Sequence, residues 1–121
     1  MSYVERHVVD VATATGGGVT AYTPVVTGRI AAIRYVKDGT TPLASTSDFT
    51  ITTDESAQNL WVDSNINASE NVYPVIAGNL AGTGAASVLA EVPVYASRER
   101  VKIVVAQGGN TKVGRFIVVV A

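Results

Sequence analysis

The sequence predicts an all-β fold, a single-domain β-sandwich or small jelly-roll-like barrel of about seven or eight strands. Short segments rich in Val, Ile, Tyr and Thr recur along the chain, and turn residues separate them at fairly regular spacing. The stretch 98–121 holds two strongly apolar segments, and at most one short segment favours a helix. Because 121 residues is a usual size for one domain, we expect a single domain over residues 1–121.

The closing stretch gives the strongest strand signal. Residues 100–106 alternate and then become wholly apolar, and residues 113–120 end in an apolar run. The intervening residues 108–110, Gly-Gly-Asn, supply a turn because Gly and Asn tolerate positive φ, so we predict one β-hairpin. Successive side chains of a strand point to opposite faces, and both faces of the second arm are apolar. The protein itself or another subunit must therefore cover both faces.

The N-terminal third of the chain also reads as strands. Residues 3–11 and 19–23 flank a turn at Gly16–Gly18, and this pattern predicts an N-terminal hairpin. Residues 28–37 predict a long strand, and the segment Asp38–Pro42 is rich in turn-forming residues that end it.

Two alternating segments in the middle of the chain predict a second hairpin. Residues 49–52 alternate between apolar and polar side chains, and residues 59–63 follow after a turn at residues 54–56. One face of this hairpin is apolar and the other is polar, which is typical of a half-buried antiparallel pair.

From Ser64 to Glu91 the strand pattern disappears. Residues 77–86 are rich in small side chains and predict a long Gly/Ala-rich loop, while residues 85–91 favour about two helical turns. Residues 92–95 predict a short edge segment, because Pro93 cannot donate to a central ladder. A loop of this length inside a compact domain is usually functional or partly disordered.

Composition favours a protein covered by partners over one that binds nucleic acid or membrane. The chain is 47% hydrophobic and only 16% charged, and its net charge is −1. No run of Lys and Arg is present, so we expect no nucleic-acid partner. No apolar run is long enough for a membrane helix, and the first residues lack the pattern of a signal peptide. The absence of cysteine weakly favours an intracellular origin.

The residues that carry chemistry do not form a recognisable catalytic set, so we expect no enzyme, no cofactor and no metal. The lone histidine, His7, alternates with valines in the first strand and is expected to be packed or at the rim. The acids near the second hairpin lie at strand ends and turns, where such residues make local hydrogen bonds. These acids are Asp48, Asp54, Glu55 and Asp63.

Two other features have a functional and a structural interpretation. The glycines of residues 78–84 lack the Lys and Ser or Thr of a phosphate loop, so flexibility is the better interpretation. Trp61 and the five tyrosines would suit a sugar-stacking platform, whereas the alternative is that Trp61 covers a neighbouring loop from the polar face of its hairpin.

Several segments together resemble a family of small proteins from tailed bacteriophages and prophages, encoded in the head-assembly module near the major capsid protein. The resemblance covers most of the chain and is one of whole segments. These segments are residues 2–11, 21–30, 33–39, 48–52 and 100–109.

The resemblance implies a structural virion protein, a capsid decoration or cement protein. Such β-rich subunits bind the outer surface of the phage head and stabilise contacts between major capsid protein subunits. The implied location is the capsid surface, after synthesis in the cytoplasm of the bacterial host. The alternative is a carbohydrate- or receptor-binding β module associated with a tail or fibre.

We expect the N-terminal segment and the long loop to contact the capsid lattice. Tyr3, Glu5 and Arg6 lie at a chain end, where a segment is often loose until it docks. The loop contributes apolar residues without strand periodicity: Val72, Tyr73, Ile76, Leu80, Val88 and Leu89. The alternative is that the loop folds back and caps one end of the barrel. Low charge and the two-faced apolar strand also predict a homo-oligomer, a trimer or a dimer.

Overall fold

The computed structural model describes residues 4–79 and 86–121, and these residues form an all-β fold with eleven strands. The expected all-β sandwich is confirmed, although the strands are more numerous than expected. The strands are β1 (Glu5–Ala12), β2 (Val19–Tyr22), β3 (Val26–Lys37), β4 (Ser47–Thr53), β5 (Asn59–Ile66), β6 (Glu70–Val72), β7 (Val75–Asn79), β8 (Ala86–Pro93), β9 (Tyr95–Glu99), β10 (Val101–Ala106) and β11 (Val113–Val120).

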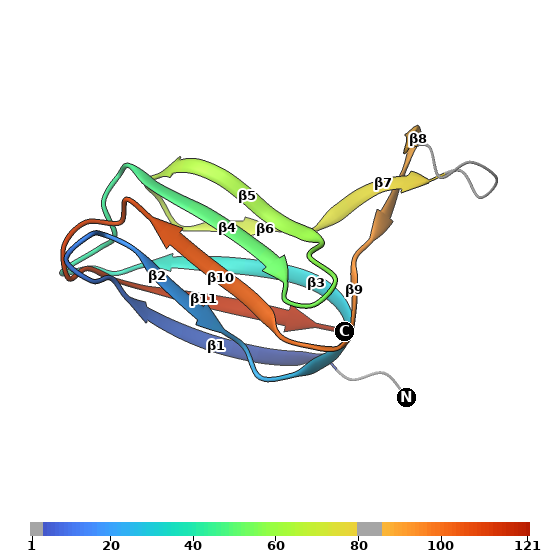
Figure 1. Ribbon diagram of the computed structural model, residues 1–121, viewed down its shortest axis with the longest axis horizontal. Coiled ribbons are helices and arrows are strands. Elements are labelled where there is room, and N and C mark those ends of the chain that lie inside the picture. The colour runs from blue at the N-terminus through green and yellow to red at the C-terminus, as the bar shows by residue number, and fades with distance from the viewer. Residues whose placement is uncertain (1–3, 80–85) are drawn as a thin grey trace.

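Two antiparallel sheets form the sandwich. The first, sheet A, has the order β1-β11-β3-β6, with β9 also paired to β3. The second, sheet B, has the order β2-β10-β4-β5. The two orders match position by position, so β1 and β2, β11 and β10, β3 and β4, and β6 and β5 hold corresponding places in opposite sheets. The remaining pair, β7 and β8, projects from one end of the sandwich (Figure 1).

The predicted closing hairpin is wrong, although its two strands have the expected bounds. The first arm, β10, pairs with β2 and β4, whereas the second arm, β11, pairs with β1 and β3. The residues between them cross from one sheet to the other, and Gln107, Gly109 and Thr111 reverse the chain with positive φ. This arrangement gives each strand a partner on both sides and turns both apolar inner faces into one core.

The prediction of an N-terminal hairpin is also wrong. Strands β1 and β2 lie in different sheets, because β1 pairs with β11 and β2 pairs with β10. The second hairpin is confirmed, since β4 pairs directly with β5. The stretch 64–91 is not a plain loop. It contains β6, which pairs with β3, and the β7–β8 pair, with β8 standing where helical turns were expected.

The connections at one end of the sandwich are tied to each other by backbone hydrogen bonds. Gly108 N–H donates to the Gly17 carbonyl over 2.8 Å, and Ala44 N–H donates to the Gly108 carbonyl over 2.9 Å. The buried Thr13 hydroxyl donates to the Gly109 carbonyl (2.6 Å) and accepts from Lys112 N–H (2.8 Å). Three crossing segments, 13–18, 38–46 and 107–112, thus satisfy their buried polar groups mutually.

Four aromatic rings occupy the centre of the core. The Phe49 ring from β4 lies 4.9 Å from Tyr35 (β3), 5.3 Å from Trp61 (β5) and 4.9 Å from Phe116 (β11), centroid to centroid. All three contacts have edge-to-face geometry, which aromatic quadrupoles favour. Strands β3 and β11 belong to sheet A, and β4 and β5 belong to sheet B, so the cluster joins one sheet to the other.

Replacing Phe49 by Ala should lower the free energy of unfolding by about 3–5 kcal/mol, because the core loses its central ring and keeps a cavity. Phe116→Ala should behave similarly, since that ring is also fully buried. Chemical denaturation measures the change, and Val62→Ala, at a site 58% exposed, serves as the control with a change within about 0.5 kcal/mol. Equal stability of Phe49→Ala and Val62→Ala would contradict the core assignment.

Two adjacent glycines allow a sharper test of the crossing segments. Gly17 has φ +81°, and a Cβ there would lie 3.1 Å from Gly109 N and 3.2 Å from Gly108 N, whereas a Cβ on Gly16 meets nothing within 4 Å. Gly17→Ala should therefore destabilise the fold by about 1–3 kcal/mol. Gly16→Ala should be neutral or stabilising by up to about 1 kcal/mol. Thermal melts that gave the two variants the same stability would refute the close approach of these segments.

Candidate interaction surfaces

His7 and the acids near the second hairpin have separate hydrogen-bond partners. His7 is partly exposed on β1, and its Nε2 lies 3.2 Å from the Glu5 carboxylate. Asp63 and Asp48 accept backbone hydrogen bonds from Ser64 and Asn65, in keeping with the local role expected from sequence. Within residues 4–79 and 86–121, no group of three or more His, Cys, Asp or Glu side chains is placed to hold a metal ion. The same residues include no helix that is long and apolar enough to cross a membrane.

Trp61 does not stand on the polar face of its hairpin. It is only 7% exposed and packs edge-on against Phe49, and its neighbour Leu60 is buried as well. A register shift between Ile51 and Thr52 in the facing strand lets consecutive residues of β5 both turn inward. The aromatic platform that the sequence suggested around Trp61 is therefore not available on the surface.

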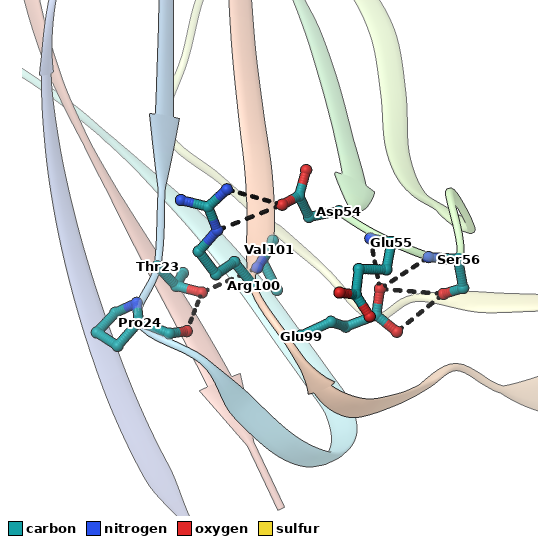
Figure 2. A network of polar contacts seen from close by, with 8 residues as sticks. All are labelled: Thr23, Pro24, Asp54, Glu55, Ser56, Glu99, Arg100 and Val101. Atoms are coloured by element: carbon teal, nitrogen blue, oxygen red, sulfur yellow. Dashed lines mark hydrogen bonds and ion pairs between the residues drawn. The ribbon is translucent and has the colours of Figure 1, made fainter.

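A buried carboxylate organises the end of the sandwich from which β7 and β8 project (Figure 2). Glu99, only 6% exposed, accepts hydrogen bonds from the backbone N–H groups of Glu55 (2.9 Å) and Ser56 (3.0 Å) and from the Ser56 hydroxyl. Burial raises the pKa of Glu99, but hydrogen bonds from Ser56, Glu55 and Ser97 outweigh it and hold the pKa below its ordinary value. This carboxylate fixes the β4–β5 turn against β9.

Arg100 extends the same region towards the surface of sheet B. Its guanidinium donates to Asp54 over 2.9 Å and lies 3.9 Å from the centre of the Tyr22 ring, a cation–π contact. Beneath it, the buried Thr23 hydroxyl accepts from Val101 N–H and donates to the Pro24 carbonyl. Among the described residues, no buried side-chain nitrogen or oxygen lacks a hydrogen-bond partner, so the buried part of the network in Figure 2 is structural.

The base of the β7–β8 pair carries three exposed aromatic or apolar side chains. Tyr73 is 67% exposed, Tyr95 61% and Val75 51%. Tyr73 and Val75 also line a hollow of about 270 Å³. The other residues of the hollow are Arg29, Ile30, Ala31, Pro74 and Pro93. We refer to Tyr73, Val75, Tyr95 and this hollow as the arm base.

A second and larger depression of about 510 Å³ lies at the opposite end of the sandwich, where β1, β3 and β11 meet the crossing segments. It is lined by the Asp10–Arg115 ion pair (2.7 Å) and by Lys37, Asp38 and Val36. The hydrogen bond and charge of Arg115 lower the pKa of Asp10. Asp38 accepts from the N–H groups of the turn that follows it, and Lys37 donates to Asn67, so these charges have intramolecular partners.

The residues expected to contact a capsid come from the N-terminal segment and from the long loop. Glu5 and Arg6 are exposed but not loose, because they form the start of β1 opposite Val120 and Val119. The expectation of a free N-terminal segment is therefore wrong from Glu5 onwards. Tyr3 lies outside the described residues.

The loop residues divide in a similar way. Val72 and Ile76 pack against the core, so the expectation that they have no place in the sandwich is wrong. Tyr73, between them, is exposed at the arm base. Val88 and Leu89 belong to β8, and Leu80 lies outside the described residues.

Sequence reasoning missed Tyr95 and Val75 at the arm base. Tyr95 lies two residues after Pro93, which ends β8, and Val75 directly follows Pro74. The chain direction on either side of a proline cannot be read from periodicity alone. The available signal was composition, because the segments 72–75 and 92–95 each contain two valines, one proline and one tyrosine.

Comparisons with known proteins give little beyond this geometry. No family model matches the chain, and no curated protein matches it significantly. Among solved structures, a crystal structure of FLHE aligns over 98% of this chain and 98% of that chain, with a TM-score of 0.46 and 12% identity. At that TM-score and identity the similarity assigns no function.

The buried carboxylate predicts loss of stability in acid. Because the folded state lowers the pKa of Glu99, its contribution is fully present above the unfolded value near 4.5 and is lost as pH falls through the lower folded value. Glu99→Gln should lower the free energy of unfolding by roughly 1–3 kcal/mol at pH 7, and this difference should shrink below about pH 4. Denaturation curves between pH 7 and pH 3 measure it. Glu55→Gln removes the same charge from an exposed side chain of the same turn, and an equal effect would contradict the role of Glu99.

Proposed function

We propose that the chain is a structural virion protein, a capsid decoration protein that binds the outer surface of a phage head and joins neighbouring major capsid protein subunits. Two observations support the proposal. Whole segments of the sequence resemble small proteins of phage head-assembly modules, and the fold presents a projecting two-stranded arm with exposed aromatic side chains at its base. The arm base is the observation that carries the proposal.

The arm is the kind of element that a neighbouring subunit would cover. Strands β7 and β8 pair with each other, and no third strand joins them among the described residues. A two-stranded pair alone in water is only marginally stable. Contact with another protein would bury Val75 and Val92, which are 51% and 38% exposed.

The arm base has the composition of a binding hot spot. Tyrosine and arginine dominate the energetics of protein interfaces, and Tyr73, Tyr95 and Arg29 lie around one hollow or beside it. Arg29 of β3 and Tyr95 of β9 are directly opposite each other in the antiparallel pair, so their side chains are neighbours on one face of the sheet. A partner seated there would meet two aromatic side chains and one cation together.

The sandwich holds this surface rigidly. Ile30 N–H donates to the carbonyl of Val94 over 2.9 Å, and both residues are buried. On the entering side, Val72 of β6 pairs with Ile33 of β3, and Pro74 after it is buried. The two chain segments that enter and leave the arm are therefore anchored to β3, so binding there would require little ordering of the arm base.

The alternative function is a carbohydrate- or receptor-binding module, for which Trp61 was the main candidate. Its burial removes the largest aromatic side chain from the surface. Among the described residues, the exposed tyrosines are those of the arm base and Tyr22, whose ring lies under Arg100. Capsid decoration therefore remains the better supported function.

The test is binding to expanded capsids of the phage that encodes the chain. Tyr73→Ser combined with Tyr95→Ser should lower the affinity for these capsids about tenfold or more, because each is a hot-spot type of residue. Since both side chains are more than half exposed, folding should be retained, which circular dichroism checks.

Val62→Ser is the matched control, because Val62 is 58% exposed on sheet B, outside the arm base. It should bind capsids like the parent. Cryo-electron microscopy of decorated particles locates the contact. Failure of the parent protein to bind purified expanded capsids at any concentration tested would overturn the proposed function, and unchanged binding of the double variant would exclude the arm base.

A further inference from the structure

The edge strands of the sandwich differ in how open they are. Strand β5 ends its sheet with two register shifts and a positive φ at Asn65, and β9 carries a positive φ at Arg98. The other edges are short, since β2 spans Val19–Tyr22 and β6 spans Glu70–Val72. Bulges, kinks and short length are the usual means by which proteins prevent edge pairing.

Strand β1 has none of these protections. It pairs with β11 in unbroken register from Glu5 to Ala12, and within the described part of the chain no strand lies on its other side. It contains no proline or glycine, and none of its residues has positive φ. One row of its backbone N–H and C=O groups is thus available to another strand.

The side chains of β1 that face outward from the sandwich are Arg6, Val8 and Asp10. They lie opposite Val119, Ile117 and Arg115, while Val9 and Val11 are buried on the other face. Val8 is 46% exposed, and Ile117 beside it is covered. The outer face of β1 therefore presents one cation, one apolar side chain and one anion in order.

We propose that two copies of this chain form a two-fold dimer by antiparallel pairing of their β1 strands, centred on Val8. In that register Arg6 of each copy lies opposite Asp10 of the other, and Val8 lies opposite Val8. Sheet A then continues across the axis as one sheet.

Other registers fit less well. Centring the pair on Arg6 or on Asp10 places like charges directly opposite each other, which destabilises a sheet. Centring it on His7 places Arg6 opposite Val8 and Asp10 opposite Val4. Centring it on Val9 places Asp10 opposite Val8 and Arg6 opposite Ala12, so neither register forms an ion pair. A shift by one residue would put buried side chains of one copy beside exposed side chains of the other. Only the Val8-centred register gives two ion pairs and a continuous apolar centre.

The electrostatic arrangement also favours this register. Asp10 already contacts Arg115 at 2.7 Å, and Arg6 has no ion-pair partner among the described residues. Arg6 of the second copy would place Asp10 between two cations. Because these groups are exposed, the dimer should weaken as ionic strength rises.

Cysteine cross-linking tests the axis directly, because the chain contains no cysteine of its own. The variant Val8→Cys should be converted to a covalent dimer by mild oxidation or by a short bis-maleimide at low micromolar concentration. Val62→Cys is the control, since Val62 is similarly exposed on the edge strand β5. Equal cross-linking of both variants would overturn the proposal.

Charge exchange tests the register. Arg6→Asp and Asp10→Arg should each raise the dimer dissociation constant about tenfold in sedimentation equilibrium, and the double variant should recover most of the parent affinity. Arg34→Asp makes the same charge change on β3, away from the edge, and should leave the dissociation constant within about twofold.

Three results would overturn the dimer: a monomeric parent protein at its highest soluble concentration, single variants that dimerise like the parent, or a double variant that does not recover. None of these measurements involves capsids. The dimer and the proposed decoration function therefore stand or fall separately.

Discussion

The fold depends on three crossing segments that bond to one another at one end of the sandwich. Each carries the chain from one sheet to the other, so neighbours in sequence face each other across the core and pair with distant strands. Their backbone groups would be unsatisfied without the bonds between Gly17, Gly108 and Ala44 and the buried Thr13 hydroxyl. Those bonds fix which strands meet, and the aromatic cluster around Phe49 then fills the space between the sheets.

The two proposed interaction surfaces both follow from this arrangement. Strand β3 runs through the middle of sheet A, and it anchors the arm base through Ile30 while contributing Tyr35 to the core. Strand β1 remains an outer edge because its neighbour in sequence, β2, lies in the other sheet. The arm base and the β1 edge are therefore held by the same core yet lie on different strands.

Much of the fold could be predicted from the sequence, because alternation shows directly which face of a strand is buried. The bounds of β10 and β11 and the β4–β5 hairpin followed from it. The pairing of β10 and β11 could not be predicted in this way, because a glycine-rich turn with positive φ occurs equally well in a hairpin and in a crossing between sheets. Trp61 was misplaced because a bulge interrupts the alternation. In the candidate site Tyr73 was foreseen, while Tyr95 depends on how the chain turns around Pro93.

The position of β11 has a consequence for synthesis. It is the central strand of sheet A, with β1 on one side and β3 on the other, yet it is made of residues 113–120. Until the ribosome has released those residues, β1 and β3 have no common partner and Phe49 lacks one of its aromatic neighbours. Nascent chains should therefore expose apolar strands until residues 113–120 have left the ribosome, and chaperone binding is most needed before that point.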